Sequence, residues 1–311
     1  MVKVETCYLP SSDGKSQLHM MHWSGDCPVK AVLQISHGMI EHIGRYDEFA
    51  RTLAEQGIAV AGHDHLGHGK SSNPEDFGFF AEENGHSCVI KDIHRVSLRI
   101  AHLYPDVPHF ILGHSMGSFF LRRYLTVYGQ ELSGAVIMGT GDQPSVLILA
   151  GLILSSLVGR IKGPRYRSPF LHNLVLGGYN KNFAPVETPS DWLSRDRDKV
   201  AEYVADPYCS FFFTCSAYQV LFQILRDLKS KRLLRQTPKE LPVFLVSGDE
   251  DPVGDFGKGV IRVFRQLKRI GLTDVTMKLY PESRHEILNE INRECVYEDI
   301  ASWVSSHLGH L

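Results

Sequence analysis

The sequence lacks the features that mark several other protein classes. Its 311 residues include only six cysteines, scattered without a C-x-x-C pair, which fits reduced thiols better than a disulfide framework. The 33 basic and 35 acidic residues nearly balance, so no nucleic-acid partner is expected. No run reaches the roughly 20 apolar residues that a membrane span needs, and the N-terminal stretch has no apolar signal-peptide core. We therefore expect a cytoplasmic protein of unknown oligomeric state.

Short apolar runs alternate with amphipathic segments through the first half of the chain. This alternation predicts an α/β fold, with a mostly parallel central sheet flanked by helices on both faces. The turn SSDGK between residues 3–10 and 16–24 predicts an antiparallel hairpin at the edge of the sheet. The expected buried strands are residues 30–36, 58–63, 109–114 and 132–140, and the expected helices are residues 44–57, 88–105 and 115–129.

The alternation stops after residue 140 and resumes with expected strands at 241–248 and 274–281. We therefore predict a core formed by residues 1–140 and 239–311, interrupted by a helical cap at 141–238. Within the cap, the apolar run at 145–159, followed by four basic residues in RIKGPRYR, predicts either a buried helix or a helix that touches a membrane peripherally.

Two further cap segments receive simpler predictions. The charged stretch at 190–208 is expected to form a solvated face of the cap. Cys209 and Cys215, which flank phenylalanines, are expected to pack as small apolar residues.

One short segment carries the strongest chemical signal. Gly113-His114-Ser115-Met116-Gly117 fits G-x-S-x-G, with an expected strand before it and an expected helix after it. The glycines allow the two sides of a sharp turn to pack closely, and the turn exposes the serine hydroxyl at the start of a helix. Ser115 is thus the candidate nucleophile.

A serine hydroxyl needs a base, and the base needs an orienting acid. In G-x-S-x-G hydrolases the chain order is serine, acid, histidine. The acid should follow the strand at 241–248, and we favour Asp251, with Asp249 as its main rival. Glu250 and Asp255 lie in the same loop. His285 is the only histidine that directly follows the last expected strand, so it is the predicted base.

Negative charge develops on the substrate oxygen during attack, and two N–H groups must stabilise it. The amide after the nucleophile, that of Met116, is one candidate. The other is the amide of Met39 in the loop HGMIEH, where Gly38 allows the backbone to approach closely.

These segments together resemble the α/β-hydrolase family, and more narrowly its monoacylglycerol lipase and lysophospholipase group, also described as serine-aminopeptidase-type hydrolases. The resemblance rests on HGMIEHIGRYDEFA, GHDHLGHGKS, LGHSMGS, SGDEDPV and RHEILNE, which follow one another in the family's order. It implies that Ser115, Asp251 and His285 form the triad, that Met39 and Met116 form the oxyanion hole, and that the helical insertion roofs an acyl channel. One departure is Ser118, where many relatives carry a second glycine.

The resemblance also suggests residues for the polar end of the substrate pocket. The motif H-G-x-x-E-H-x-x-R-Y implies that Glu41 and Arg45 shape that end, although the same two residues fit a local i, i+4 ion pair. The substrate-binding candidates are His37, Gly38, Glu41, Arg45 and His114.

A different cluster resembles a metal site at first sight. His63, Asp64, His65 and His68 crowd one short segment. The segment ends in the G-H-G-x-S loop that is usual for the fold, so we predict no metal and no cofactor.

The predicted activity is therefore hydrolysis of a carboxylic ester of a single-chain lipid, with a monoacylglycerol as first choice, through an acyl-serine intermediate. The alternatives are a lysophospholipase, a general carboxylesterase or thioesterase, an aminopeptidase-type hydrolase, a metal-dependent hydrolase, and an acyl-binding scaffold without catalysis.

Overall fold

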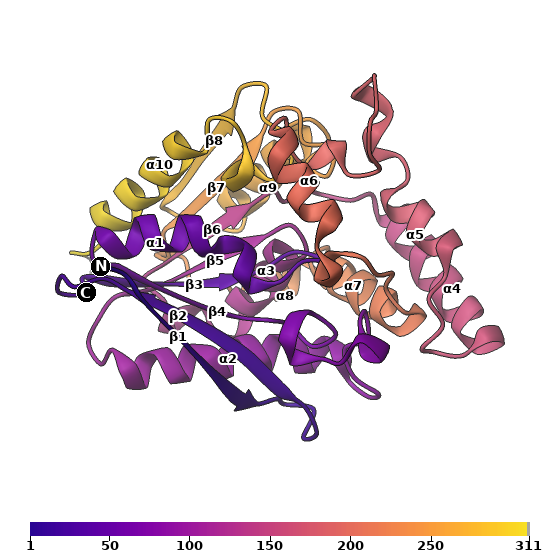
Figure 1. The fold of residues 1–311 in the computed structure, drawn as a ribbon, viewed down its shortest axis with the longest axis horizontal. Helices are drawn as coiled ribbons and strands as arrows, with labels where there is room; N and C mark the ends of the chain where they lie inside the picture. Colours follow the sequence, from indigo (N-terminus) through magenta and orange to yellow (C-terminus); the bar gives the residue numbers. More distant parts are fainter. Residues whose placement is uncertain (310–311) are drawn as a thin grey trace.

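An eight-stranded sheet forms the centre of the computed structural model, which describes residues 1–309 (Figure 1). Its strand order is β1-β2-β4-β3-β5-β6-β7-β8. The first two strands are antiparallel to their neighbours and the other six run parallel, so the predicted α/β fold with an edge hairpin is confirmed. The strands are β1 (Lys3–Pro10), β2 (Gln17–Ser24), β3 (Ala31–Ser36), β4 (Ile58–His63), β5 (His109–His114), β6 (Gly134–Met138), β7 (Val243–Gly248) and β8 (Val275–Tyr280).

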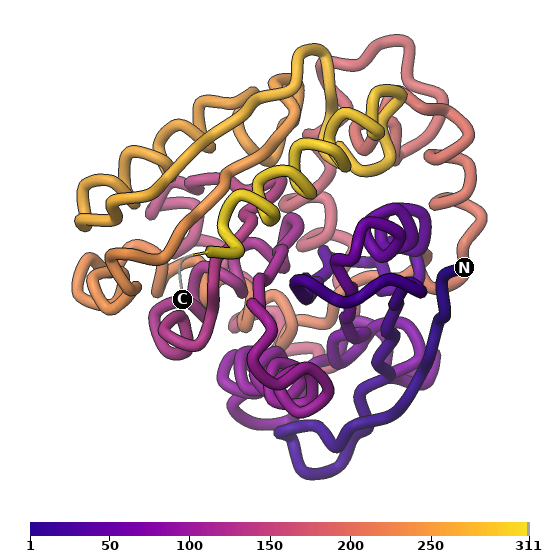
Figure 2. Tube along the Cα trace, turned by 90° about the vertical axis from the view of Figure 1, so that its left-hand side faces the viewer, coloured from indigo at the N-terminus to yellow at the C-terminus, as the bar shows by residue number. Residues whose placement is uncertain are grey.

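Helices cover both faces of this sheet, which explains why β3, β4, β6 and β7 are buried at every residue. Helices α1 (Asp47–Glu55) and α10 (Arg293–Ser306) pack on one face, and Figure 2 shows them side by side. Helices α2 (Gly85–Leu103), α3 (Met116–Tyr128) and α9 (Lys258–Arg269) pack on the other. The edge strand β8 instead alternates between buried and more exposed residues.

Five helices lie between β6 and β7, in residues 139–242, which we call the cap segment. No strand is assigned within it; a single bridge joins Arg167 to Thr214. Helix α7 packs on α2 and α3 of the core. Helix α4 packs on the outer side of α7, far from both chain termini (Figure 1). The helices are α4 (Ser145–Lys162), α5 (Pro169–Leu176), α6 (Arg197–Ala205), α7 (Cys215–Asp227) and α8 (Lys231–Leu234).

Short 3-10 helices complete the chain and change some of the expected boundaries. The expected helix at 44–57 is a 3-10 turn followed by α1, and the expected helix at 88–105 is α2, which ends before Pro105. The predicted third segment, 239–311, ends with two residues outside the described part. The 3-10 helices are η1 (Ile43–Tyr46), η2 (Gly69–Ser71), η3 (Pro74–Asp76), η4 (Gly129–Glu131), η5 (Tyr179–Asn182), η6 (Asp191–Leu193), η7 (Pro207–Cys209) and η8 (Ile287–Asn289).

The turn between β5 and α3 is as sharp as the sequence predicts. Ser115 has φ 52° and ψ −118°, a conformation that non-glycine residues rarely adopt. A side chain at Gly113 would lie 2.5 Å from the carbonyl oxygen of Gly117, and one at Gly117 would collide with the carbonyl of Ser36. The Ser115 amide donates to the Met138 carbonyl at 3.0 Å, which fixes the turn to β6. The glycines are therefore required by close backbone packing.

Candidate active site

Ser115 lies at the floor of a cavity between the carboxyl ends of the strands and the cap segment. The cavity has a volume of about 70 Å³. Its lining combines apolar side chains, among them Phe119, Val175, Leu176 and Leu221, with charged and polar groups. A larger surface hollow of about 690 Å³ adjoins the hairpin around Asp13. Ser115 and the residues around it do not line this hollow. We take the smaller cavity as the site because it alone of the two contains a nucleophile beside a base.

His285 and Asp251 are paired at the wall of this cavity. The ring Nδ1 of His285 lies 2.9 Å from Asp251 Oδ1, and both side chains are buried. Asp251 also accepts the Val253 amide at 2.8 Å and the Ser247 hydroxyl at 3.2 Å. The second ring nitrogen of His285, Nε2, forms no hydrogen bond within residues 1–309, and His285 and Ser115 line the same cavity.

The other three acidic candidates lie elsewhere. Asp249 forms no hydrogen bond with His285 within the described residues; its amide donates to the Tyr280 carbonyl. Glu250 is half-buried, and Asp255 forms an ion pair with Arg262 at 3.0 Å. Among these four acids, the structure therefore brings only Asp251 to the imidazole.

The cap segment contributes an aromatic contact to the same histidine. The ring of Trp192 lies 5.0 Å from the ring of His285, and the His285 amide donates to the Trp192 carbonyl at 3.5 Å. Tyr203 from α6 donates to the Ile40 carbonyl at 3.0 Å. The prediction of a purely solvated face at 190–208 is thus wrong, because Trp192 and Tyr203 turn inward and line the cavity.

The two candidate oxyanion donors, the amides of Met39 and Met116, belong to residues that line the cavity with Ser115. Met116 is the first residue of α3, where an N–H has no acceptor within its own helix. The Met39 amide forms no hydrogen bond within the described part of the chain, and both residues line the cavity. A side chain at Gly38 would approach Ser115 Cβ to 3.2 Å. The loop therefore comes as close to the nucleophile as the sequence argument requires.

A buried charged network stands behind these groups. Arg45 binds Glu286 through two hydrogen bonds of 2.6 and 2.7 Å and binds Glu41 at 3.1 Å. Glu41 accepts the Gly38 amide, the Tyr46 hydroxyl at 3.0 Å and the ring of His114 at 3.0 Å. The predicted i, i+4 pair exists, but the stronger partner of Arg45 is Glu286. The network thus joins the loop of Met39 to the residue after His285.

The network also fixes charge states. Burial alone would raise the pKa of Glu41, but His114 and Arg45 hold it well below its usual range. Burial likewise opposes ionisation of Glu286, and the charge of Arg45 outweighs it and lowers that pKa. Burial would lower the pKa of His114, yet the hydrogen bond and charge of Glu41 raise it. Both carboxylates are therefore ionised at neutral pH.

The histidine-rich segment braces the same loop through hydrogen bonds. His37 donates from Nδ1 to the Gly38 carbonyl at 2.8 Å, and its Nε2 accepts the His65 amide at 2.9 Å. Burial lowers the pKa values of the four buried histidines of this region, to about 3 for two of them, His63 and His68. The other two are His37 and His65. All four are therefore neutral, and no metal-ligand group within residues 1–309 includes any of them.

The substrate-binding candidates separate into two groups. Gly38, Glu41 and His114 line the cavity. His37 is fully buried behind the loop, and the Arg45 guanidinium is held by two carboxylates, so neither contacts the cavity. They are substrate-binding candidates by sequence because the motif of the resembling family includes them.

Sequence reasoning missed Glu286, Trp192 and Tyr203. Glu286 follows His285 directly and is the one of the three with a usable signal, an acidic residue beside the predicted base. Nothing near Trp192 or Tyr203 in the sequence indicates that they reach the site, because their partners lie in distant segments.

Residues 27–292 match the family described as "Serine aminopeptidase, S33". The chain belongs to this family. The predicted resemblance is thereby confirmed, as is the predicted class, a serine hydrolase similar to monoacylglycerol lipases.

Individual relatives match over nearly their whole length. The monoacylglycerol lipase of Mycolicibacterium smegmatis is 28% identical, with 92% of each chain covered. The monoglyceride lipase of Homo sapiens is 30% identical, with 96% of this chain and 89% of that protein covered.

Solved structures agree with the fold. A thermostable carboxyl esterase from Bacillus coagulans in complex with glycerol superposes with a TM-score of 0.91 at 28% identity, covering 98% of this chain and 99% of the esterase. A soluble variant of monoglyceride lipase from Saccharomyces cerevisiae in complex with a substrate analog superposes with a TM-score of 0.78 at 20% identity, covering 98% and 97% of the two chains. At that identity the likeness shows the fold alone.

The buried network predicts a stability effect that depends on pH. Glu286→Gln should lower the free energy of unfolding at pH 7 by about 3 kcal/mol, because Arg45 loses a buried carboxylate. The folded-state pKa of Glu286 is depressed, so its contribution is present above about pH 4.5 and fades as the pH falls below that value. The difference between wild type and variant, measured by urea unfolding, should therefore shrink in acid.

Glu187→Gln is the matched control, because Glu187 pairs with Arg197 on the exposed surface. It should change the free energy of unfolding by less than about 1 kcal/mol. Equal effects of the two substitutions would show that the Arg45 network contributes no special stability.

Proposed function

We propose that this chain is a lipid-ester hydrolase that cleaves monoacylglycerols through a covalent acyl-serine. The observation that carries the proposal is the pairing of His285 with Asp251 at a cavity whose floor is Ser115. The mixed polar and apolar lining of the cavity and the names of the relatives support the choice of substrate.

The proposed reaction has two stages. In the first, His285 Nε2 removes the Ser115 proton while Oγ attacks the ester carbonyl, and the Met39 and Met116 amides stabilise the oxyanion. The tetrahedral intermediate expels the alcohol, which takes the proton from His285. In the second, His285 deprotonates water, the hydroxide attacks the acyl-serine, and the proton returns to Ser115 as the fatty acid leaves. Asp251 stabilises the imidazolium in both stages.

The cavity wall favours a substrate with one acyl chain and a small polar head. Phe119, Val175 and Leu176 would contact the chain. Glu41 and Tyr203 lie among the polar lining groups and would face the glycerol hydroxyls. The esterase from Bacillus coagulans, solved in complex with glycerol, supports this end of the assignment.

The cap segment must move for a lipid to enter. A cavity of about 70 Å³ is far smaller than the roughly 300–1,000 Å³ typical of ligand pockets. We propose that residues of the cap segment, including Trp192, withdraw when substrate binds and that the structure represents the closed form.

A substrate panel tests the proposed function. Monoacylglycerols should give a higher kcat/KM than lysophospholipids, p-nitrophenyl esters, acyl thioesters and aminoacyl amides. Ser115→Ala should lower the hydrolysis of every substrate to near background and should abolish labelling by a fluorophosphonate. Preference for lysophospholipids or for aminoacyl amides would overturn the substrate class, and turnover by Ser115→Ala would overturn the mechanism.

We also propose that α4 contacts a lipid surface from outside. By length and composition, α4 is the one helix within residues 1–309 that could cross a membrane, and 22% of its apolar window is buried. Its small residues Gly151 and Gly159 face Phe222 and Cys215 of α7. Because one side of α4 is packed against the protein, α4 is better suited to lie on the surface of a membrane than to cross it. Its outward apolar residues, each more than half exposed, are Val146, Leu147, Leu149, Ile153, Leu157 and Ile161.

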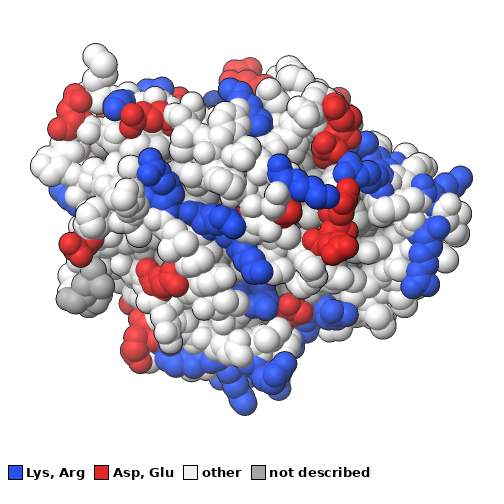
Figure 3. Space-filling view, turned by 90° about the horizontal axis from the view of Figure 1, so that it is seen from below, with Lys and Arg blue, Asp and Glu red and all other residues white. Residues whose placement is uncertain are grey.

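Charge around α4 is compatible with this orientation. Figure 3 shows acidic and basic groups mixed over much of one face, whereas the lobe where α4 lies is mostly uncharged with basic groups at its outer edge. Of the four basic residues expected to attract anionic lipid, Arg165 pairs with Asp76 and Arg167 binds backbone carbonyls. Arg160 and Lys162 remain exposed for headgroups.

Vesicle binding tests this proposal. The double variant Leu149→Glu, Ile153→Glu should bind phosphatidylcholine–phosphatidylserine vesicles at least about tenfold more weakly. The reason is that two apolar side chains that would move from water into the lipid on binding are replaced by charged ones. Leu98→Glu is the control, since Leu98 is 55% exposed on core helix α2. Equal binding by wild type and double variant would contradict the proposed contact.

A further inference from the structure

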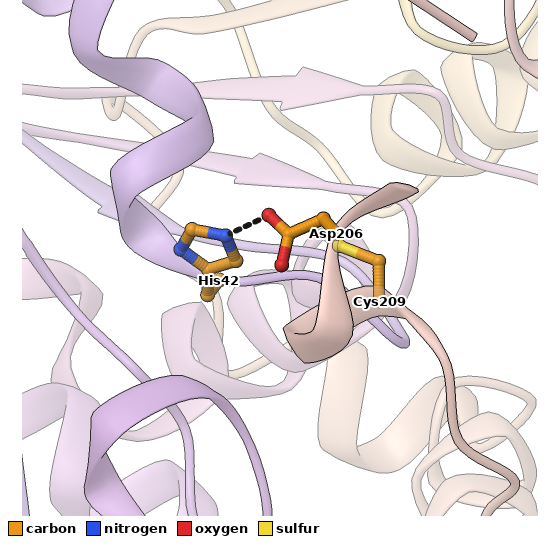
Figure 4. A group of neighbouring side chains, drawn as sticks. All are labelled: His42, Asp206 and Cys209. Atoms are coloured by element: carbon orange, nitrogen blue, oxygen red, sulfur yellow. Dashed lines mark hydrogen bonds and ion pairs between the residues drawn. The ribbon is translucent and has the colours of Figure 1, made fainter. Parts of the chain in front are cut away.

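A second cluster of chemically reactive side chains lies where the cap segment meets the core. His42 comes from the loop before η1. Asp206 directly precedes η7 of the cap segment, and Cys209 is the last residue of η7 (Figure 4). His42 Nε2 lies 2.8 Å from Asp206 Oδ2. One ligand atom from each residue, including the Cys209 sulfur, lies within 4.8 Å of the others.

The three donors form a set suited to zinc. Imidazole nitrogen, carboxylate oxygen and thiolate sulfur all bind Zn²⁺, at about 2.0–2.3 Å, so tetrahedral ligands lie about 3.3–3.8 Å apart. The His42–Asp206 separation of 2.8 Å is shorter than that spacing and the 4.8 Å limit of the group is longer, so an ion would have to replace the His42–Asp206 hydrogen bond. Their charges also match, because one carboxylate and one thiolate balance a divalent cation.

The site is open to solvent on one side and supported on the other. The side chains of His42 and Asp206 are 19% and 23% exposed, so an ion can reach both from solvent. Cys209 is buried beneath them. The other oxygen of Asp206 accepts the Tyr208 amide at 2.7 Å, which orients the carboxylate from behind.

We propose that His42, Asp206 and Cys209 bind Zn²⁺, with water as the fourth ligand. Binding replaces the proton of the Cys209 thiol, which passes to solvent. Under this proposal Cys209 binds an ion in addition to packing as the small apolar residue that the sequence predicts. The site is separate from the histidine-rich segment that the sequence made conspicuous, and its ligands come from parts of the chain 164 residues apart at His42 and Asp206.

Zinc at this position would join two parts of the protein that the reaction requires to separate. His42 follows Glu41, which holds the Gly38 amide, and Asp206 lies in the cap segment. An ion bound to both would hold the cap segment closed, so zinc should inhibit turnover. This consequence rests on the proposed function, whereas the binding itself does not.

Cobalt titration of the full-length, chelator-treated protein tests the binding directly. Co²⁺ should produce near-ultraviolet thiolate-to-cobalt absorption at one equivalent, and Zn²⁺ should displace it. Cys209→Ser should abolish that absorption, and both it and Asp206→Asn should weaken Zn²⁺ binding, measured by calorimetry, by about 100-fold or more. Circular dichroism identifies any variant that fails to fold.

Cys295→Ser is the matched control, because Cys295 is an exposed free thiol. It should leave the cobalt spectrum unchanged. Absence of thiolate absorption in the wild type, or its loss in Cys295→Ser and survival in Cys209→Ser, would overturn the site. Binding without inhibition of hydrolysis would overturn only the proposed effect on the cap segment.

Discussion

The hydrogen bond between Asp251 and His285 is the constraint on which the rest of the site depends. Asp251 has no contact with solvent, and its oxygens are occupied by His285, the Val253 amide and the Ser247 hydroxyl. A carboxylate held in this way fixes one ring nitrogen of the imidazole and leaves the other directed to the cavity. The adjacent parallel strands β7 and β8 bring the two loops together at one edge of the sheet.

A buried arginine connects the segment of His285 with the loop of Met39, which we propose as base and oxyanion donor. Arg45 contacts Glu286, beside the base, and Glu41, which holds the amide of Gly38. Buried ion pairs are costly to desolvate, so net stability alone is a weak reason to have one. Here the arrangement couples the positions of the base and the oxyanion donors. The contact of Trp192 with His285 connects the cap segment to the same group of residues.

The parts of the molecule that follow local rules could be predicted from the sequence. The strands of the core are continuous apolar runs, and the glycines at 113 and 117 indicate a turn whose backbones touch. His285 could be singled out because it is the one histidine that directly follows the last strand; the next histidine in the chain is His307, in the C-terminal stretch. Asp251 was harder to separate from Asp249, since two residues of the same loop differ only in which one the fold directs inward.

Long-range contacts could not be predicted in this way. Glu286 as the partner of Arg45, Trp192 on His285, and the meeting of His42 with Asp206 all depend on how distant loops pack. The sequence pattern placed His37 and Arg45 with the substrate because they belong to one motif. Burial and competing hydrogen bonds direct them elsewhere.

The most direct measurement compares Asp251→Asn with Asp249→Asn, two substitutions of the same kind two residues apart. With folding verified by circular dichroism, Asp251→Asn should lower kcat for monoacylglycerol hydrolysis by about 10⁴-fold. Asp249→Asn should retain kcat within about tenfold, because the His285 ring is hydrogen-bonded to Asp251 and not to Asp249. The reverse result, with activity kept by Asp251→Asn and lost by Asp249→Asn, would contradict the account.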